Sequence, residues 1–196
     1  MKKLAPKISV RDKILNTAVE LFYTRGVNNV GIDEIIKCSG VAKMSLYNHF
    51  KSKNELVEAY LETVNAKRVS TVIEKINQLA PKPEDRLFAF FDILGEWFKS
   101  KEFRGCPCIN TMAEISDVKD PIFKKCSSLK QGLLDYIQLL VKDAGVVDNK
   151  DISLQILLLI DGAIVRAIAT GKADHAKLAK QACIILINQA KIKKSK

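Results

Sequence analysis

Residues 32–50 read IDEIIKCSGVAKMSLYNHF, and their pattern organises the first part of the chain. Apolar residues recur at three- and four-residue steps before and after Gly40, as they do on the inner faces of two short helices. Glycine accepts the left-handed backbone that follows a helix, so the first helix is predicted over Ile32–Ser39. The second is predicted three residues later, over about Lys43–Phe50. Two short helices joined by such a tight turn form a helix-turn-helix.

A helix before this pair supplies the surface on which it packs. Ser9 can cap the N-terminus of that helix, and Gly26 ends it. Its apolar face consists of Ile14, Leu15, Ala18, Leu21 and Phe22. The side chains expected to pack against it are Ile32, Ile35, Ile36, Val41, Leu46 and Phe50. The opposite face of the second short helix stays free to enter a DNA major groove.

Positive charge is concentrated near the start of the chain. The 196 residues include 32 Lys and Arg against 22 Asp and Glu, a formal net charge of +10. Residues 1–55 carry a net charge of +5 and residues 56–190 only +1, and four lysines follow from Lys191 onward. This distribution is typical of a small nucleic-acid-binding module attached to a body with another task. A basic, solvated surface that binds nothing is the alternative.

The rest of the chain is also predicted to be helical. Ser52 and Glu55 form a capping box, from which a long helix runs toward Leu79. Pro81 and Pro83 interrupt the pattern. Further helices are predicted over Leu87–Lys99, Ile109–Ile115, Pro121 to about Ala144, Asp151–Thr170 and Asp174–Ile192. No strand-length run of alternating apolar residues occurs, so the predicted fold class is all-α.

Three segments of the sequence together resemble one family. They are Ile14-Leu15-x-x-Ala18-x-x-Leu21-Phe22-x-x-Arg25-Gly26, Leu46-Tyr47-Asn48-His49-Phe50 and Lys51-Ser52-Lys53-x-x-Leu56. With Gly40 and Val41 between them, they resemble the DNA-binding domain of the TetR/AcrR family of transcriptional regulators. The resemblance implies a homodimer with a helix-turn-helix DNA-binding domain over residues 1–55. It also implies a helical effector-binding and dimerisation domain over residues 56–196, whose small-molecule ligand usually releases the protein from a palindromic operator.

The resemblance assigns roles on double-stranded DNA to eight side chains. Those expected to hold phosphates are Tyr47, Lys51 and Lys53, which suits a phenol hydroxyl, an ammonium group and a helix N-terminus. Those expected on base edges are Lys43, Ser45 and Asn48, with Met44 and His49 at the edge of the set. Plain surface exposure is the alternative for each of them.

Two positions depart from the family pattern, which usually has Ser or Thr where Gly31 and Ala42 stand. Gly31 is still an acceptable helix cap. Ala42 is a poor helix cap, and its lack of a capping hydroxyl lowers the stability of the helix by about 0.5–2 kcal/mol. Met44 stands where a small residue is common and offers only apolar contact, for example to a thymine methyl group.

Large apolar side chains are dense between residues 84 and 145, and some of them are expected to line a cavity for a small, mainly apolar effector. The predicted pocket residues are Phe91, Trp97, Cys106, Cys108, Asn110, Met112 and Asp161. Because Asp161 lies in an apolar helix, we expect it to have a partner such as Arg166 or a ligand group. A surface position, or a pairing across the dimer, is the alternative.

The five cysteines form an odd set that fits a reducing compartment. Cys106-Pro107-Cys108 invites a metal or redox interpretation, but the chain has only two histidines, His49 and His175. No metal or other cofactor is therefore expected. A structural or pocket-lining role is the main prediction for these cysteines, and a repressor that senses redox state or electrophiles through Cys106 and Cys108 is the alternative.

An enzyme is not expected, because the sequence has no nucleotide-binding glycine loop and no Ser or Cys nucleophile with a nearby His and acid. A DNA-binding protein without an effector is the remaining alternative. Lys7 and Arg11 interrupt any signal peptide, and the apolar run Ile152–Ile160 has about half the length of a membrane span. A cytoplasmic protein with no membrane partner is therefore predicted.

The last two predicted helices carry more apolar residues than one layer of body helices should cover. We expect them to pair with a second copy as a four-helix bundle. The residues assigned to this interface are Ile156, Leu157, Leu159, Ile160, Ala163, Ile164, Ala167, Cys183, Ile184, Leu186 and Ile187.

Overall fold

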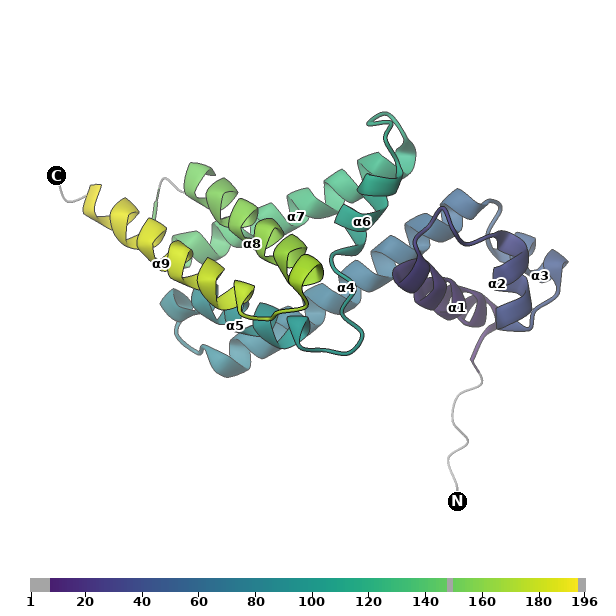
Figure 1. The fold of residues 1–196 in the computed structure, drawn as a ribbon, viewed down its shortest axis with the longest axis horizontal. Helices are drawn as coiled ribbons and strands as arrows, with labels where there is room; N and C mark the ends of the chain where they lie inside the picture. The colour runs from purple at the N-terminus through teal and green to yellow at the C-terminus, as the bar shows by residue number, and fades with distance from the viewer. Residues whose placement is uncertain (1–7, 148–149, 194–196) are drawn as a thin grey trace, which may run out of the picture. The chain divides into compact units, whose positions relative to one another are not determined.

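The computed structural model describes residues 8–147 and 150–193, and every regular element in these ranges is helical (Figure 1). The elements are α1 Val10–Arg25, α2 Ile32–Ser39, α3 Lys43–His49, α4 Lys53–Leu79, a 3-10 turn Pro83–Asp85, α5 Arg86–Phe98, α6 Pro107–Glu114, α7 Pro121–Asp143, α8 Lys150–Thr170 and α9 His175–Lys193. The all-α prediction is confirmed. Of the predicted basic tail, Lys194 and Lys196 lie outside the described residues, as does Lys7.

Helix α6 begins two residues earlier than predicted. The predicted helix begins at Ile109, but Pro107 is the first residue of α6. Proline fits a first helical position, because that backbone nitrogen needs no hydrogen-bond partner within the helix. The proline therefore starts this helix.

The helices form two compact units, each built from two stretches of the chain. The reader unit comprises the residues up to Ala66 together with Pro107–Cys126, and the body unit comprises Lys67–Cys106 and the residues from Ser127 onward. Helix α4 contributes its first half to the reader unit and its second half to the body unit. Compactness alone gives no unit a function, so the functional boundary predicted after residue 55 stays a prediction.

The core of the reader unit is formed where α1, α2, α3 and the start of α4 meet. Ile14 and Phe22 of α1, Ile35 of α2 and Leu46 of α3 are fully or almost fully buried. The Phe22 ring packs against Tyr60 of α4 at a centroid distance of 5.5 Å. The buried residues of the helix pair are those predicted, except that Ile32, Ile36 and Val41 are only half-buried.

The ends of the reader helices follow from local chemistry. Ser9 caps α1 by accepting the backbone N–H of Asp12 at 3.1 Å. Gly40 adopts the left-handed conformation at φ +65°, and its N–H bonds the carbonyl of Ile36 at the end of α2. A side chain at this φ would be strained, so glycine permits the tight turn into α3.

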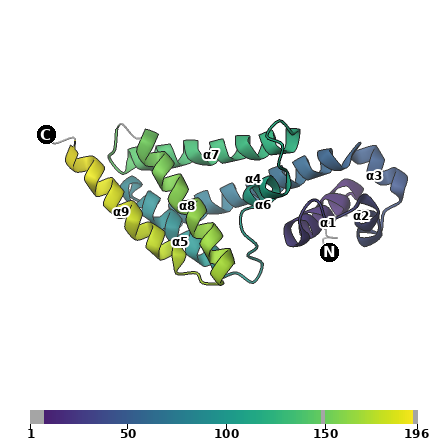
Figure 2. The same cartoon turned by 45° about the horizontal axis from the view of Figure 1, so that its top comes forward.

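The body unit packs α5, α7, α8 and α9 with the second half of α4. Figure 2 shows α5, α8 and α9 side by side, in agreement with their contacts. Helices α5 and α9 approach closely because Gly95 lacks a side chain, and a Cβ there would lie 3.4 Å from the Cβ of Ala176. The inner faces of these helices supply buried residues such as Phe91, Ile137 and Ile160.

Most residues predicted for the dimer interface lie in this core instead. The buried ones are Ile156, Ile160, Ala163, Ile164, Ala167, Cys183 and Ile187. They pack against the other helices of the same chain. The sequence pattern could not distinguish such packing from packing against a second copy. Among the residues whose burial is described, the large apolar side chains that α8 and α9 expose are Leu154, Leu158, Val165, Ile168, Leu178, Ile184 and Ile185.

Within the described residues, α8 is the one helix long and apolar enough to cross a membrane by length and composition. Its inner face packs in the body core through Ile156 and Ile164. Asp161 and Arg166 interrupt its apolar character. These features are those of a core helix with a second, exposed apolar face.

Candidate nucleic-acid interface

Helix α3 starts without a side-chain cap. Ala42 stands at its N-cap position with an extended backbone, and no side chain bonds the first N–H groups. The Ala42 carbonyl accepts the N–H groups of Ser45 at 2.9 Å and of Leu46 at 3.2 Å. The uncapped start expected from Ala42 is confirmed, and Gly31 at the start of α2 likewise provides no side-chain cap.

The two faces of α3 have opposite characters. Leu46 and the following Phe50 are buried, and they fix the helix on α1 and α2. Met44 is 72% exposed on the other face. The remaining exposed side chains of α3 are Lys43, Tyr47, Asn48 and His49. Ser45 is half-buried between the two faces, so it presents less of its surface than the others.

Lys43 already has an acidic partner. Its ammonium group lies 3.4 Å from the carboxylate of Asp33, which is in the first turn of α2. Both side chains are mostly exposed, and such a pair contributes little stability. A DNA phosphate or a guanine edge could replace Asp33 as the partner of Lys43 with little loss of interaction free energy. Asp33 was not among the predicted site residues, although the helix-turn-helix fixes its position ten residues before Lys43.

The start of α4 holds the two lysines assigned to phosphates. Ser52 accepts the N–H of Glu55 at 3.2 Å, and the Glu55 carboxylate accepts the backbone N–H of Lys51 at 2.7 Å. The predicted capping box therefore forms, with the return bond one residue before Ser52. Lys51 is exposed and Lys53 half-buried. Both stand at a helix N-terminus, which favours anions.

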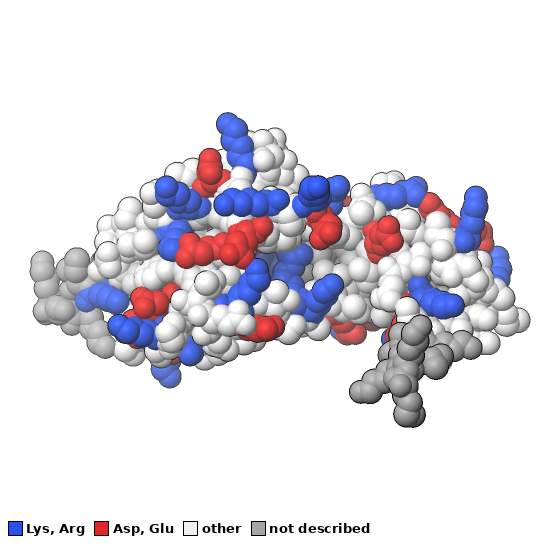
Figure 3. All heavy atoms as spheres, turned by 90° about the horizontal axis from the view of Figure 1, so that it is seen from below, with Lys and Arg blue, Asp and Glu red and all other residues white. Residues whose placement is uncertain are grey.

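Charges of both signs are mixed over the surface outside α3. Figure 3 shows Lys and Arg interspersed with Asp and Glu on one face of the protein. In the reader unit, Arg25 pairs with Glu34, and the guanidinium of Arg11 lies over the Phe50 ring at 5.0 Å. Arg11 therefore lies beside the end of α3, whereas Arg25 is paired with α2.

Comparisons with known proteins agree with this geometry. The family described as "Bacterial regulatory proteins, tetR family" matches residues 14–60, which cover α1 to α3 and the start of α4. The HTH-type transcriptional regulator LmrA of Bacillus subtilis is 27% identical over 179 residues, 89% of this chain and 94% of LmrA. The chain belongs to the TetR family of transcriptional regulators. Its helix-turn-helix is a DNA-binding element, and these relatives are named transcriptional regulators.

Other TetR-family proteins resemble the chain over shorter or longer stretches. The HTH-type transcriptional repressor NemR of Escherichia coli is 27% identical over 111 residues, 56% of each chain. That match therefore spans only a little over half of NemR. The crystal structure of a TetR-type regulator from Streptomyces avermitilis superposes with a TM-score of 0.82 at 25% identity, over 94% of this chain and 99% of the other. The N-terminal helix-turn-helix and helical C-terminal part are shared with this fold.

Four of the predicted pocket residues lie in the body unit. Phe91 is buried in its core, and Cys106 is half-buried. The Trp97 ring meets Phe103 edge-on at 4.8 Å, and the guanidinium of Arg68 covers Trp97 at 3.5 Å. An effector that stacks on this face of Trp97 would have to displace the arginine.

Asp161, the fourth, pairs with Lys130 of α7 and not with Arg166, which is exposed. The expectation of a partner is confirmed, but the named partner was wrong. Sequence could not show it, because Lys130 comes from another helix. The Lys130 side chain is 16% exposed, so the pair is well shielded from water.

The other three predicted pocket residues lie in the reader unit. Cys108 is buried in α6, while Asn110 and Met112 are half-buried. The seven residues thus divide between the two units, and the predicted pocket stays a prediction. Within the described residues, no three His, Cys, Asp or Glu side chains lie close enough together to hold a metal ion.

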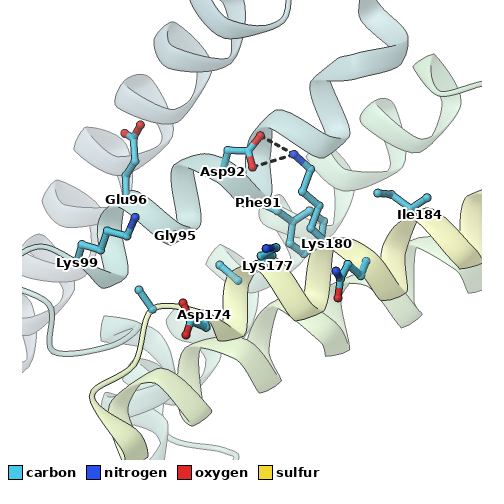
Figure 4. Close-up of a pocket in the computed structure, with 12 residues that line it drawn as sticks. Phe91, Asp92, Gly95, Glu96, Lys99, Asp174, Lys177, Lys180 and Ile184 are labelled. Atoms are coloured by element: carbon cyan, nitrogen blue, oxygen red, sulfur yellow. Dashed lines mark hydrogen bonds and ion pairs between the residues drawn. The ribbon is translucent and has the colours of Figure 1, made fainter.

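A groove of about 560 Å³, which no sequence pattern predicted, lies between α5 and α9 in the body unit (Figure 4). Gly95, Ala173 and Ala176 line it together with charged side chains. Asp92 and Lys180 close one part with an ion pair at 2.6 Å. Of the predicted pocket residues, Phe91 lines this groove. The small residues Gly95 and Ala176 on facing helices were the available signal.

Proposed function

We propose that the chain represses transcription by binding a palindromic operator as a homodimer, with α3 of each copy in the major groove. The observation that carries this proposal is the division of α3 into a buried face around Leu46 and an exposed face around Asn48. An amide can bond an adenine edge bidentately, and the Met44 thioether can contact a thymine methyl. Tyr47, Lys51 and Lys53 hold the flanking phosphates.

The exposed apolar residues of α8 and α9 pair the two copies. Leu158 is 71% exposed in the middle of α8, and Ile185 is 57% exposed on α9. Apolar residues exposed along two neighbouring helices favour burial against another surface. A two-fold axis lets the same helices of a second copy cover them. Two readers related by that axis match the symmetry of a palindrome.

A small, mainly apolar effector binds the body unit and lowers the affinity for DNA. It can do so only by the difference in its affinity for the two states of the protein, typically about 1–3 kcal/mol. Helices α4 and α7 each contribute to both units and connect them covalently. A protein that acts on DNA in this way works in the cytoplasm, and the exposed face of α8 is covered by the partner copy.

The DNA half of the proposal is tested with a duplex selected by the wild-type chain from a random-sequence library. Asn48→Ala should relax the preference at one base pair by about 1–3 kcal/mol. Fluorescence anisotropy against single-base variants of the duplex measures this. Equal losses of affinity for the selected duplex and for random DNA would show that Asn48 contacts only the DNA backbone and no base edge.

The effector half is tested by thermal stability against a library of metabolites and drugs, since any ligand of the native state raises the melting temperature. Trp97→Ala, in the body unit, should bind the selected duplex almost as the wild type does and lose the response to a hit. Release of DNA by this variant at wild-type ligand concentrations would place the effector elsewhere. If no compound in the library raised the melting temperature, a DNA-binding protein without an effector would be favoured.

A further inference from the structure

The turn between α1 and α2 is held by a residue from a distant part of the sequence. Glu114, the last residue of α6, accepts the backbone N–H of Val27 at 3.2 Å and that of Asn28 at 2.7 Å through its carboxylate. Its backbone carbonyl also accepts the side-chain amide of Asn28 at 2.9 Å. Helix α6 and this turn both belong to the reader unit. One residue therefore makes three hydrogen bonds to two successive residues of the turn.

The backbone of the turn is shaped to receive this carboxylate. Gly26 ends α1 with φ at +87°, a conformation that other residues rarely adopt. A Cβ at Gly26 would lie 2.6 Å from Oε1 of Glu114, closer than real Cβ contacts occur. The carboxylate thus lies directly against the glycine, and it satisfies two adjacent N–H groups that follow the helix end.

The same turn sets where α2 stands on α1. Val27 and Val30 are buried at its two ends. Asn29 donates its side-chain amide to the carbonyl of Arg25 at 2.9 Å. Arg25 also pairs with Glu34 of α2. Since α3 packs on α1 and α2, a shift of this turn would change the orientation of the DNA-facing helix.

We propose that Glu114 is a positioning residue for DNA recognition, through which α6 controls the orientation of α2 and α3. Helix α6 starts at Pro107, directly after Cys106 in the body unit. A change in the body unit that moves the start of α6 would therefore act on the bonds of Glu114 to the turn. This inference rests on the proposed DNA-binding function and adds a named residue to it.

Glu114→Gln in the full chain tests the proposal. Glutamine keeps the size of the side chain but has one acceptor oxygen and no charge, so a charge-assisted hydrogen bond is lost. We expect the affinity for the duplex selected by the wild-type chain to fall about tenfold. Affinity for random-sequence DNA should stay the same or rise, because a negative charge has been removed.

Glu20→Gln is the matched control, because Glu20 is exposed on α1 and the substitution changes the charge by the same amount. Its affinities for both duplexes should stay the same or rise together. A Glu114→Gln protein that behaves as Glu20→Gln does would overturn the proposal. A general loss of folding would instead lower both affinities and the melting temperature, and would also overturn it.

Amide hydrogen exchange gives a second readout that does not depend on DNA. The N–H groups of Val27 and Asn28 should exchange at least about tenfold faster in Glu114→Gln, while that of Phe22 within α1 keeps its rate. Unchanged rates at the two turn amides would contradict the proposal. If the wild-type chain selects no sequence, the proposed function fails and the positioning role fails with it, whatever the exchange rates show about the contact.

Discussion

Single side chains around α3 differ in what they can recognise on DNA. The ammonium groups of Lys51 and Lys53 can neutralise phosphates of any sequence, whereas the Asn48 amide can tell one base edge from another. Lys43 could bind either a phosphate or a guanine edge. In this structure its ammonium group is paired with Asp33. A contact of Lys43 with DNA would therefore have to break one weak, exposed ion pair.

Lys51→Ala and Lys53→Ala should each weaken binding to every DNA sequence and reduce the salt slope of the affinity by about one. The reason is that each substitution removes one phosphate contact and the counterion release that goes with it. Anisotropy titrations over a range of salt concentrations measure the slope. Lys67→Ala, which removes an exposed lysine in the middle of α4, is the control and should leave the slope unchanged.

The cysteines should differ strongly in reactivity. Cys38 is exposed on α2, whereas Cys183 is fully buried, and burial raises the pKa of the Cys183 thiol to about 12. At pH 8 a disulfide reagent should modify Cys38 within the native protein and reach Cys183 only after unfolding, because the thiolate is the reactive form. A fast phase of undiminished amplitude in Cys38→Ser would contradict this. Release of the selected duplex from modified Cys38→Ser protein would favour the thiol-sensing alternative.

At the scale of elements, the helix ends explain why the chain could be divided into helices from its sequence. Ser9, Gly26 and Gly40 act through their own backbone or a neighbour three or four residues away, so the local pattern contains the information. Pro107 could have been placed the same way, because proline is common at a helix start. The contacts of Glu114 could not be predicted in this way, since its partners Val27 and Asn28 lie 87 and 86 residues away in the sequence.

The uncapped start of α3 should be improvable. Ala42→Ser places a hydroxyl where the first N–H groups of α3 lack a side-chain partner, and should raise the free energy of unfolding of the reader unit by about 0.5–2 kcal/mol. Ser52→Ala removes the cap of α4 and should lower it by a similar amount. Urea titrations followed by circular dichroism measure both changes. A stability of Ala42→Ser at or below that of the wild type would show that the hydroxyl is not oriented to cap α3.

At the scale of the whole molecule, the sequence predicted that α8 and α9 are apolar but not which of their faces is internal. Both helices have apolar residues on two faces. The spacing of these residues does not show which face packs against the other helices of the same chain. The structure places Ile187 inside and Ile185 outside. A test of pairing must therefore substitute exposed residues, since glutamate at Ile187 would disrupt the body core.

Leu158→Glu and Ile185→Glu should each convert the protein to monomers, because a carboxylate would be buried in the paired surface without a partner. Leu139→Glu is the matched control. Leu139 is 59% exposed but lies on α7, so its variant should stay dimeric. Sedimentation velocity at micromolar concentration distinguishes the two states. A dimeric Leu158→Glu protein would show that α8 does not form the interface.

The predicted pocket shows the same limit of sequence pattern. Trp97 and Asn110 were placed together because both lie among apolar residues, but they belong to different compact units. The groove beside Phe91 escaped notice because it depends on how Gly95 and Ala176 face each other across two helices. The exposed face of α3 was easier to predict, because its residues lie within one short helix, while their contacts with DNA stay a prediction.

The most direct measurement is selection of DNA from a random-sequence library by the full-length wild-type chain, with the stoichiometry of the selected complex determined by sedimentation. Two copies on one duplex should select two inverted half-sites, with centres about 34–36 Å or a multiple of that apart. Enrichment of no sequence, or of a single half-site bound by one copy, would contradict a dimeric regulator that reads DNA with α3.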